Sequence, residues 1–329
     1  MRRVYAAAVG VTCCRVWVCE LRRNGVLMKT RVAFIGVGKM GSGMAMQLCG
    51  AGYLLRVFDT SEVAVAALVA AGAERASSAV QAVEGADVLF TSLPVPEVVE
   101  SVYYEIFDRD RPGLVCVDVS TSDPSTVRRV CGLVEAHGAR YLACPVGRGV
   151  DEAAAGLSSL FVGGDDATID SVLPLLDVIG GSMLRMKTPE AAAAFKLVQN
   201  MVAMANLESL CEGYALAKRW GVSDEAFATG LPDTGAWSRQ AEIRLPWLID
   251  RDFAPRFTVA LAAKDLRLAV EMAARTGVPV STGAAALQQL VAAVNDGLGE
   301  AEVTSLFKVV ERADPGPDKQ VVATTATTH

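Results

Sequence analysis

Residues 31–45 read Arg31-Val-Ala-Phe-Ile-Gly-Val-Gly-Lys-Met-Gly-Ser-Gly-Met-Ala45, an apolar run that enters a glycine-rich turn and continues into helix-forming residues. In such a segment Gly36 permits a tight turn, Gly38 lets backbone amides approach a pyrophosphate, and Gly41 lets the helix pack closely on the strand. The N–H groups at the start of the helix attract anionic oxygens. We therefore predict that the turn binds a dinucleotide through Gly36, Val37, Gly38, Lys39, Met40 and Gly41.

A lone acid follows the second apolar run, Tyr53-Leu-Leu-Arg-Val-Phe, at Asp59. This carboxylate is placed to accept hydrogen bonds from an adenosine ribose, and it would repel a 2′-phosphate, so NAD is favoured as the cofactor. Arg56 and Thr60 flank Asp59, which leaves NADP as the alternative. A glycine-rich turn without a ligand is the other reading, and the strand before it, the helix after it and the acid all disfavour that reading.

The composition restricts the class of protein. The chain has 329 residues, 52% hydrophobic and 21% charged, which suits two globular domains rather than a disordered chain. A net charge of −6 gives no phosphate-neutralising surface, so we expect no nucleic-acid partner. The chain has two histidines, and its cysteines lack the spacing of zinc ligands, so we expect no metal site and no histidine-based acid–base chemistry.

Short apolar runs alternate with amphipathic stretches over residues 30–187, which predicts a Rossmann-like α/β domain with a doubly wound, mostly parallel sheet. The expected strands are 32–36, 54–58, 88–92, 115–119, 140–144, 159–162 and 183–186, and the expected helices are 40–49, 62–71, 97–107, 125–136 and 167–178.

The pattern becomes helical after Thr188, which can cap a helix that Pro189 begins and Gly221 stops. A helix of this length is typical of a connection between domains. The helices expected after it are 224–231, a proline-interrupted stretch at 237–247, 258–275, 283–296 and 301–313. We therefore predict an all-α C-terminal domain over residues 188–313, joined to the first domain by a long interdomain helix.

The two ends of the chain differ from the rest. Residues 1–29 are basic, with Glu20 as the one acid, so this extension is either a mitochondrial targeting segment or a disordered or spurious start before a natural beginning at Met28, with secretion as the less favoured alternative. The protein is expected in the cytoplasm or the mitochondrion. The apolar run from Val4 to Cys19 is broken by Arg15 and is too short to span a membrane. Residues 314–329 are predicted to form a disordered polar tail.

A second group of polar residues is spread over the chain. Lys196 and Asn200 share one face of the long helix, where a lysine is either a solvated surface residue or a partly buried functional amine. Ser120 and Thr121 follow a strand, at the carboxyl edge where ligands bind in this architecture. A flexible segment with Gly147, Arg148 and Gly149 follows the next strand, and we expect Phe257 and Lys264 on one helix face with Asp265 beside them.

Four sequence blocks, which follow one another along the chain, resemble those of the β-hydroxyacid dehydrogenase family. The resemblance is to its 3-hydroxyisobutyrate dehydrogenase and glyoxylate/succinic semialdehyde reductase branches. The blocks are Gly36-Val-Gly-Lys-Met-Gly, Asp118-Val-Ser-Thr, Cys144-Pro-Val-Gly-Arg-Gly, and Lys196-Leu-Val-Gln-Asn with Lys264-Asp-Leu-Arg-Leu-Ala. The resemblance covers about residues 30–312. It implies an NAD(P)-dependent enzyme that interconverts a small β-hydroxy acid and its semialdehyde, and it implies a homodimer or homotetramer.

The resemblance also implies roles for residues. Lys196 is the catalytic general acid and base with Asn200 as its partner. The residues implied to bind substrate are Ser120, Thr121, Gly147, Arg148, Gly149, Phe257, Lys264 and Asp265, and those added to the cofactor site are Leu93, Pro94, Glu97 and Lys264. A base role requires the pKa of Lys196 to lie below its free value of about 10.4, and burial and the cation Lys264 would both lower it.

The chain departs from the family pattern at two places. Gly147-Arg-Gly149 replaces the usual Ser-Gly-Gly, so Arg148 either grips a substrate carboxylate or faces solvent, and Glu190-Ala-Ala replaces a Gly-x-Gly before the catalytic lysine. These departures leave the substrate open. The alternatives to an enzyme of the 3-hydroxyisobutyrate dehydrogenase type are a glyoxylate or succinic semialdehyde reductase, an imine reductase, and a non-catalytic dinucleotide-binding protein.

Overall fold

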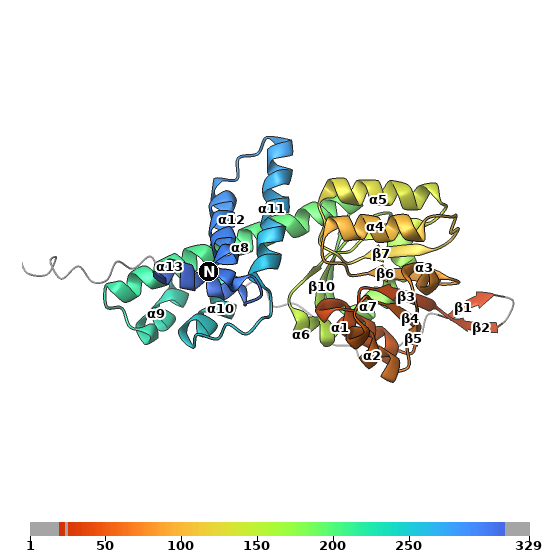
Figure 1. Ribbon diagram of the computed structural model, residues 1–329, viewed down its shortest axis with the longest axis horizontal. Coiled ribbons are helices and arrows are strands. Elements are labelled where there is room, and N and C mark those ends of the chain that lie inside the picture. Colours follow the sequence, from red (N-terminus) through yellow and green to blue (C-terminus); the bar gives the residue numbers. More distant parts are fainter. Residues whose placement is uncertain (1–19, 24–25, 313–329) are drawn as a thin grey trace, which may run out of the picture.

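The computed structural model describes residues 20–23 and 26–312 (Figure 1). Most of the extension predicted over residues 1–29, and all of the tail predicted over residues 314–329, lie outside the described residues. In the described part of the extension, β1 (Glu20–Arg23) pairs with β2 (Val26–Lys29) as an antiparallel strand. The division into two domains at residues 187 and 188 stays a prediction.

A large sheet forms the first part of the fold, with the strand order β11-β10-β8-β7-β6-β3-β4-β5 and β9 paired to β10. Its pairs are parallel, except that β10 runs antiparallel to β8 and β9. The strands are β3 (Arg31–Ile35), β4 (Leu54–Phe58), β5 (Glu74–Arg75), β6 (Val88–Thr91), β7 (Val115–Asp118), β8 (Arg140–Ala143), β9 (Val146–Gly147), β10 (Ser158–Gly163) and β11 (Gly180–Met186). The predicted mostly parallel, doubly wound sheet is confirmed.

Helices cover both faces of this sheet (Figure 1). One apolar core joins the strands to α1, α2 and α7, and the second joins the opposite face to α3, α4, α5 and the start of α8. The helices of this part are α1 (Lys39–Gly50), α2 (Glu62–Ala70), α3 (Ala79–Val83), α4 (Pro96–Ile106), α5 (Pro124–Ala136), α6 (Val150–Ala154) and α7 (Asp166–Ile179). Elements α3, α6, β5 and β9 were not predicted, because they are too short to show a hydrophobic period.

The strand order fixes where a ligand can bind. Strand β3 lies between β4 and β6, so the chain order reverses at β3, and the carboxyl ends of these parallel strands meet at one edge. Open α/β sheets bind ligands at such a reversal. The glycine-rich turn follows β3, Asp59 follows β4, Leu93 follows β6 and Ser120 follows β7.

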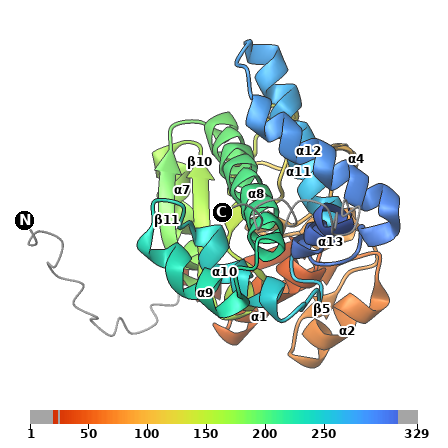
Figure 2. The ribbon, with the colours of Figure 1, turned by 90° about the vertical axis from the view of Figure 1, so that its left-hand side faces the viewer.

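The long helix α8 (Pro189–Arg219) runs from the sheet into the helical part (Figures 1 and 2). The Thr188 hydroxyl accepts a hydrogen bond from the Ala191 amide at 3.2 Å, Pro189 occupies the first turn, and Gly221 follows the helix with φ +82°. The start and the stop signal predicted for this helix are therefore both present.

The remaining helices pack around the second half of α8 and form a third apolar core. They are α9 (Asp224–Gly230), η1 (Leu231–Asp233), α10 (Arg239–Ile249), α11 (Val259–Thr276), α12 (Ser281–Ala293), η2 (Val294–Leu298), η3 (Val303–Leu306) and α13 (Phe307–Arg312). Helices α11 and α12 both contact α8 (Figure 2). The single helix predicted over residues 301–313 is wrong, because its first half is the 3₁₀ turn η3 and only the second half is α-helical.

Candidate active site

The glycine-rich turn between β3 and α1 has the packing that its sequence predicts. Gly36 has φ +85°, and its amide donates a hydrogen bond to the Phe58 carbonyl at 2.9 Å. A Cβ on Gly36 would lie 2.2 Å from the Ser92 carbonyl oxygen, and one on Gly41 would lie 2.0 Å from the Gly36 carbonyl oxygen. A Cβ on Gly38 would meet nothing within 4 Å. Gly36 and Gly41 are thus required by the fold, whereas Gly38 faces open space.

The start of α1 is suited to an anionic group. Its N-cap is Gly38, and no side chain caps the helix, so the first-turn amides have no side-chain acceptor. The Val37 side chain is buried in the sheet core, Met40 is half-buried and Lys39 is exposed. The cradle beside Gly38 and the uncapped amides together fit a dinucleotide pyrophosphate.

Asp59, at the end of β4, has backbone partners on both carboxylate oxygens. Oδ2 accepts a hydrogen bond from the Val37 amide and Oδ1 accepts one from the Ser61 amide, each at 2.8 Å. The acid therefore fixes the glycine-rich turn, and the remaining lone pairs of its oxygens are available to a ribose. Arg56 cannot easily reach a 2′-phosphate, because its guanidinium donates to the Gln81 and Glu84 carbonyls at 3.1 and 2.9 Å.

The turns after β6 and β7 are joined by Ser120. Its hydroxyl oxygen accepts a hydrogen bond from the Leu93 amide at 2.9 Å, and the hydroxyl group also interacts with the buried carboxylate of Asp118. The side chain of Ser120 is buried. Pro94 and Glu97 are exposed at the start of α4. Because the Leu93 side chain also lies against Gly36, the predicted substrate serine and the cofactor turn share one edge of the sheet.

A buried polar network under Ser120 was not predicted. Asp118 Oδ1 accepts hydrogen bonds from the Thr91 hydroxyl at 2.9 Å and the Ser120 amide at 3.0 Å, and Oδ2 accepts one from the Tyr141 hydroxyl at 2.9 Å. Burial raises the pKa of the Asp118 carboxyl, and these hydrogen bonds act against that rise. The block Asp118-Val-Ser-Thr contained the only sequence signal for this network, an acid at the end of a wholly buried strand.

The candidate catalytic lysine lies inside the molecule. Only 9% of Lys196 is exposed, so the interpretation of this residue as a solvated surface lysine is wrong. Its amine donates a hydrogen bond to Asn200 Oδ1 at 3.3 Å, as the i, i+4 spacing allows. Asn200 Nδ2 in turn donates to Asp265 Oδ2 at 2.6 Å. Gln199 also donates to Asn200 Oδ1 and was not predicted.

Lys264 connects this group to the sheet. Its amine donates a hydrogen bond to the Thr121 carbonyl at 3.0 Å and forms an ion pair with Asp265 Oδ1 at 2.8 Å. A second contact nearby, between Arg275 and Asp123 at 3.6 Å, also joins α11 to the turn after β7. The structure therefore brings Lys196, Asn200, Asp265 and Lys264 into one connected group that ends at the turn carrying Ser120 and Thr121.

The electrostatics of Lys196 suit proton transfer. Burial lowers its pKa from 10.5 to about 8, the carboxylate of Asp265 opposes this change, and the cation Lys264 adds to it. An amine with a pKa of about 8 exchanges a proton readily near neutral pH.

The predicted segment after β8 is only partly arranged as expected. Gly147 is buried beside the Phe161 ring. Arg148 is exposed with φ +71°, and its guanidinium donates to the Leu157 carbonyl at 3.1 Å. The amide of Gly149 donates to Glu152 Oε2 at 3.0 Å. Both predicted carboxylate-binding groups, the Arg148 guanidinium and the Gly149 amide, thus already have partners.

Phe257 lies before a helix rather than on one. Helix α11 begins at Val259 with Thr258 as its N-cap, so the expected shared helix face of Phe257 and Lys264 is wrong. The Phe257 amide donates to the buried carboxylate of Glu302 at 2.7 Å, which fixes the backbone there. The side chain is half-buried and packs against the third apolar core.

Comparisons with known proteins agree with this geometry. The family described as the NAD binding domain of 6-phosphogluconate dehydrogenase matches residues 31–188, and the family described as NAD-binding of NADP-dependent 3-hydroxyisobutyrate dehydrogenase matches residues 191–310. A probable 3-hydroxyisobutyrate dehydrogenase of Mycobacterium tuberculosis is 34% identical over 77% of this chain and 89% of that protein. The NAD-dependent L-serine dehydrogenase of Pseudomonas aeruginosa is 32% identical over 86% of this chain and 97% of that protein.

Solved structures give the same result. The M. tuberculosis 3-hydroxyisobutyrate dehydrogenase with L-serine superposes with a TM-score of 0.81 at 31% identity, over 86% of this chain and 99% of that one. An imine reductase from Pseudomonas sp. has a TM-score of 0.58 at 22% identity, over 85% of this chain and 99% of that one, which shows a common fold alone. The cofactor turn, the buried lysine group and these relatives together show that the chain belongs to the β-hydroxyacid dehydrogenase family of NAD(P)-dependent oxidoreductases.

Proposed function

We propose that this enzyme interconverts a small β-hydroxy acid and its semialdehyde, with Lys196 as the general acid and base and NAD as the preferred cofactor. The observation that carries the proposal is the buried Lys196 amine, which is held by Asn200 and has a pKa of about 8. A buried lysine destabilises a fold unless its charge is compensated, so a lysine retained in this position points to a chemical role.

In the proposed reaction Lys196 handles the proton on the reacting oxygen. In the oxidation direction the neutral amine accepts the hydroxyl proton, and in the reduction direction the ammonium donates a proton to the carbonyl oxygen. Asn200 Oδ1 orients the amine. Gly36–Gly41 with Leu93 would hold the cofactor at the sheet edge, where it would supply hydride-transfer chemistry.

The substrate carboxylate is proposed to bind at the turn after β7. Support comes from the cation Lys264 beside Thr121 and from the Ser120 hydroxyl in the same turn, which would donate to a carboxylate by turning its proton away from Asp118. A carboxylate near Lys264 would receive a charge-assisted interaction in a partly buried site. Gly149 would join this site only if Glu152 released its amide, and Arg148 would join only by leaving the Leu157 carbonyl.

The preference for NAD over NADP is supported by the charges at the end of β4. Asp59 presents a carboxylate where a 2′-phosphate would lie, and the guanidinium of Arg56 is held by Gln81, Glu84 and Glu74. Both features disfavour the phosphate. NADP use stays the alternative because one of the matching families is NADP-dependent.

Among substrates we favour 3-hydroxyisobutyrate and close analogues, including L-serine, since the relatives named for these compounds align over most of the chain. Glyoxylate or succinic semialdehyde reduction is the second candidate. The imine reductases share only the fold, so imine reduction is supported less well. A non-catalytic role is disfavoured by the presence of Lys196, Asn200 and Asp265 in one hydrogen-bonded group.

A substrate panel tests the proposal. The purified protein is assayed by NADH absorbance with 3-hydroxyisobutyrate, L-serine and 2-(hydroxymethyl)glutarate in oxidation, and with glyoxylate, succinic semialdehyde and cyclic imines in reduction, each with both cofactors. We expect the highest kcat/KM with a β-hydroxy acid and NAD. Turnover confined to imines, or binding of NADH without turnover of any substrate, would overturn the proposal.

We further propose a homodimer or homotetramer. The support is a row of exposed apolar side chains in the first half of α8, where Phe195, Val198 and Val202 are 38%, 41% and 52% exposed. Light scattering coupled to size exclusion measures the assembly, and a monomer at micromolar concentration would contradict it.

Among the helices of residues 26–312, none has the length and apolar character of a membrane span. The cytoplasm and the mitochondrion are the two proposed locations, which microscopy of the tagged chain distinguishes.

A further inference from the structure

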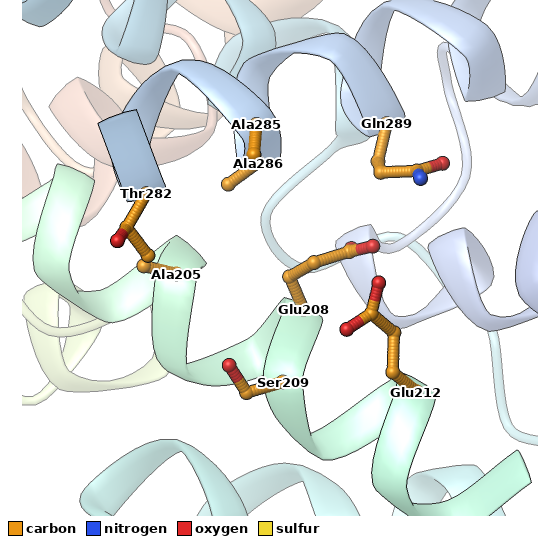
Figure 3. Close-up of a pocket in the computed structure, with 8 residues that line it drawn as sticks. All are labelled: Ala205, Glu208, Ser209, Glu212, Thr282, Ala285, Ala286 and Gln289. Atoms are coloured by element: carbon orange, nitrogen blue, oxygen red, sulfur yellow. The ribbon is translucent and has the colours of Figure 1, made fainter. Parts of the chain in front are cut away.

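A cavity of about 130 Å³ lies between α8 and α12 in the helical part of the molecule (Figure 3). Its polar side chains are Glu208, Ser209 and Glu212 from α8 and Thr282 and Gln289 from α12, and the rest of its wall is alanine. Glu208 is twelve residues after Lys196, about 18 Å further along the helix at 1.5 Å per residue. The cavity is therefore separate from the candidate active site.

The charge of Glu208 is not balanced. The residue is 7% exposed, and neither carboxylate oxygen accepts a hydrogen bond within the described residues. Figure 3 shows its carboxylate next to that of Glu212, with Gln289 facing them from α12. Burial, and secondly the charge of Glu212, raise the pKa of Glu208 to about 7. Two carboxylates thus converge in this space, and the charge of Glu212 destabilises the ionised form of Glu208.

Basic side chains do not supply the missing charge. The residues that line the cavity include no lysine or arginine. The buried guanidinium of Arg244 on α10 is near enough to act electrostatically on Cys211, as Glu208 does, but it pairs with the carboxylate of Glu302 at 3.3 Å. A positive group must therefore come from outside the described chain for both carboxylates to remain ionised.

The donor atoms define the chemical class of that group. The polar atoms lining the cavity are the oxygens of two carboxylates and two hydroxyls and the side-chain amide of Gln289, with no sulfur or imidazole. Carboxylate, hydroxyl and amide oxygens are the ligands of hard cations such as Ca²⁺ and Mg²⁺. The volume is sufficient for an ion with several waters. Two carboxylates also match the charge of a divalent ion.

We propose that the cavity between α8 and α12 binds a divalent alkaline-earth cation through Glu208 and Glu212. Within residues 20–23 and 26–312 no group of three or more His, Cys, Asp or Glu side chains is arranged as a metal site, so we expect weak, exchangeable binding with a Kd on the order of 10⁻⁴–10⁻³ M. The expectation of no metal site rested on the scarcity of histidine and on the cysteine spacing, whereas this cavity is formed by oxygen donors of α8 and α12, which meet only in the folded protein. The inference does not depend on the proposed dehydrogenase activity.

The test measures binding and stability in the full chain without substrate or cofactor. Calorimetric titration with CaCl₂ and MgCl₂ is expected to give one site per chain, and either ion should raise the thermal unfolding midpoint. E208Q and E212Q should each weaken binding about tenfold or more and lose the rise in midpoint. E105Q, which removes an exposed carboxylate of α4, is the matched control and should respond as the wild type does.

Three results would overturn the proposal. The first is that CaCl₂ and MgCl₂ neither bind to the wild type nor raise its unfolding midpoint. The second is that E208Q and E212Q both keep the binding and the rise in midpoint. The third is an equal rise in midpoint with KCl at matched ionic strength, which would show simple screening of the two charges. Should E208Q fail to fold, E212Q decides the matter alone, since Glu212 is exposed and its loss leaves the core intact.

Discussion

Replacing Lys196 by methionine is expected to abolish turnover and to stabilise the folded protein at neutral pH. Methionine is an unbranched apolar side chain that can fill the space of the lysine stem. It cannot transfer a proton, so the chemical step loses its acid and base. It also removes a buried amine whose pKa is lowered from 10.5 to about 8, and a group whose charge is disfavoured by folding reduces the stability of the fold.

The size of the stability effect follows from the pKa of Lys196. The change from 10.5 to about 8 corresponds to about 3 kcal/mol of stability lost by the folded protein at neutral pH. The wild type regains about 1 kcal/mol of this stability through the hydrogen bond from Lys196 to Asn200, which methionine cannot form. We therefore expect the variant to be more stable than the wild type by about 2 kcal/mol.

The pH dependence gives the sign of the effect. Between about pH 8 and 10.5 the unfolded chain holds more protons at this position than the folded protein, so wild-type stability rises with pH over that window. The advantage of the methionine variant is therefore complete below about pH 8 and disappears above about pH 10.5. Urea unfolding at both ends of this window measures it, and NADH absorbance measures turnover.

The control is Lys187→Met, which removes an exposed lysine shortly before the same helix and should change neither the free energy of unfolding nor the turnover. A Lys196→Met protein that is less stable than the wild type at neutral pH would show that the amine is compensated in the fold. A variant that keeps turnover would show that another group carries the proton. Either result refutes the reasoning.

Three further predictions follow from the contacts of the site. In the wild type, kcat/KM for oxidation should rise with pH through about 8, because oxidation needs the neutral amine of Lys196, and kcat/KM for reduction should fall, because reduction needs the ammonium. Asp265→Asn should move the midpoint of this pH profile to lower pH, and Asn200→Asp should move it to higher pH. Shifts in the reverse directions would contradict the assignment of Lys196 as acid and base. Gly38→Ala should fold normally and bind NADH about tenfold more weakly or worse, since Gly38 faces open space beside the helix start. Gly41→Ala should also lose stability, because its Cβ would lie 2.0 Å from the Gly36 carbonyl oxygen. Unfolding curves measure the loss of stability, and fluorescence titration with NADH measures the loss of binding. Asp59→Asn should lower the ratio of kcat/KM with NAD to that with NADP by about tenfold, about 1.4 kcal/mol, and an unchanged ratio would place the ribose elsewhere.

Much of the fold was predictable because local signals decide it. The apolar run before Gly36 and the spacing of Gly36, Gly38 and Gly41 indicate a strand, a turn and a helix from the local sequence alone. Likewise, Thr188 and Gly221 bound the long helix by capping alone. The short elements β5, β9, α3 and α6 escaped prediction because two to five residues show no period, and tertiary packing decides their conformation.

The candidate site was predictable only where its residues are close in sequence. The spacing of Lys196 and Asn200 placed both on one helix face, but burial of that face depends on packing that no local pattern reports. Asp265 lies 65 residues from Asn200, and although the sequence placed it beside Lys264, its active-site role was implied only by the resemblance to a family. Asp118 was missed as the centre of a network because its donors come from three different segments.

The position of Asn200 between Lys196 and Asp265 explains how the lysine keeps a pKa useful for catalysis. A carboxylate in direct contact with the buried amine would stabilise the ammonium and raise its pKa. Here the amide of Asn200 lies between them, and it holds the amine through Oδ1 and the carboxylate through Nδ2. The other oxygen of Asp265 pairs with Lys264, which turns part of its negative charge away from Lys196. The same contacts continue to the Thr121 carbonyl, so the group that orients the proton donor also fixes the turn that carries Ser120.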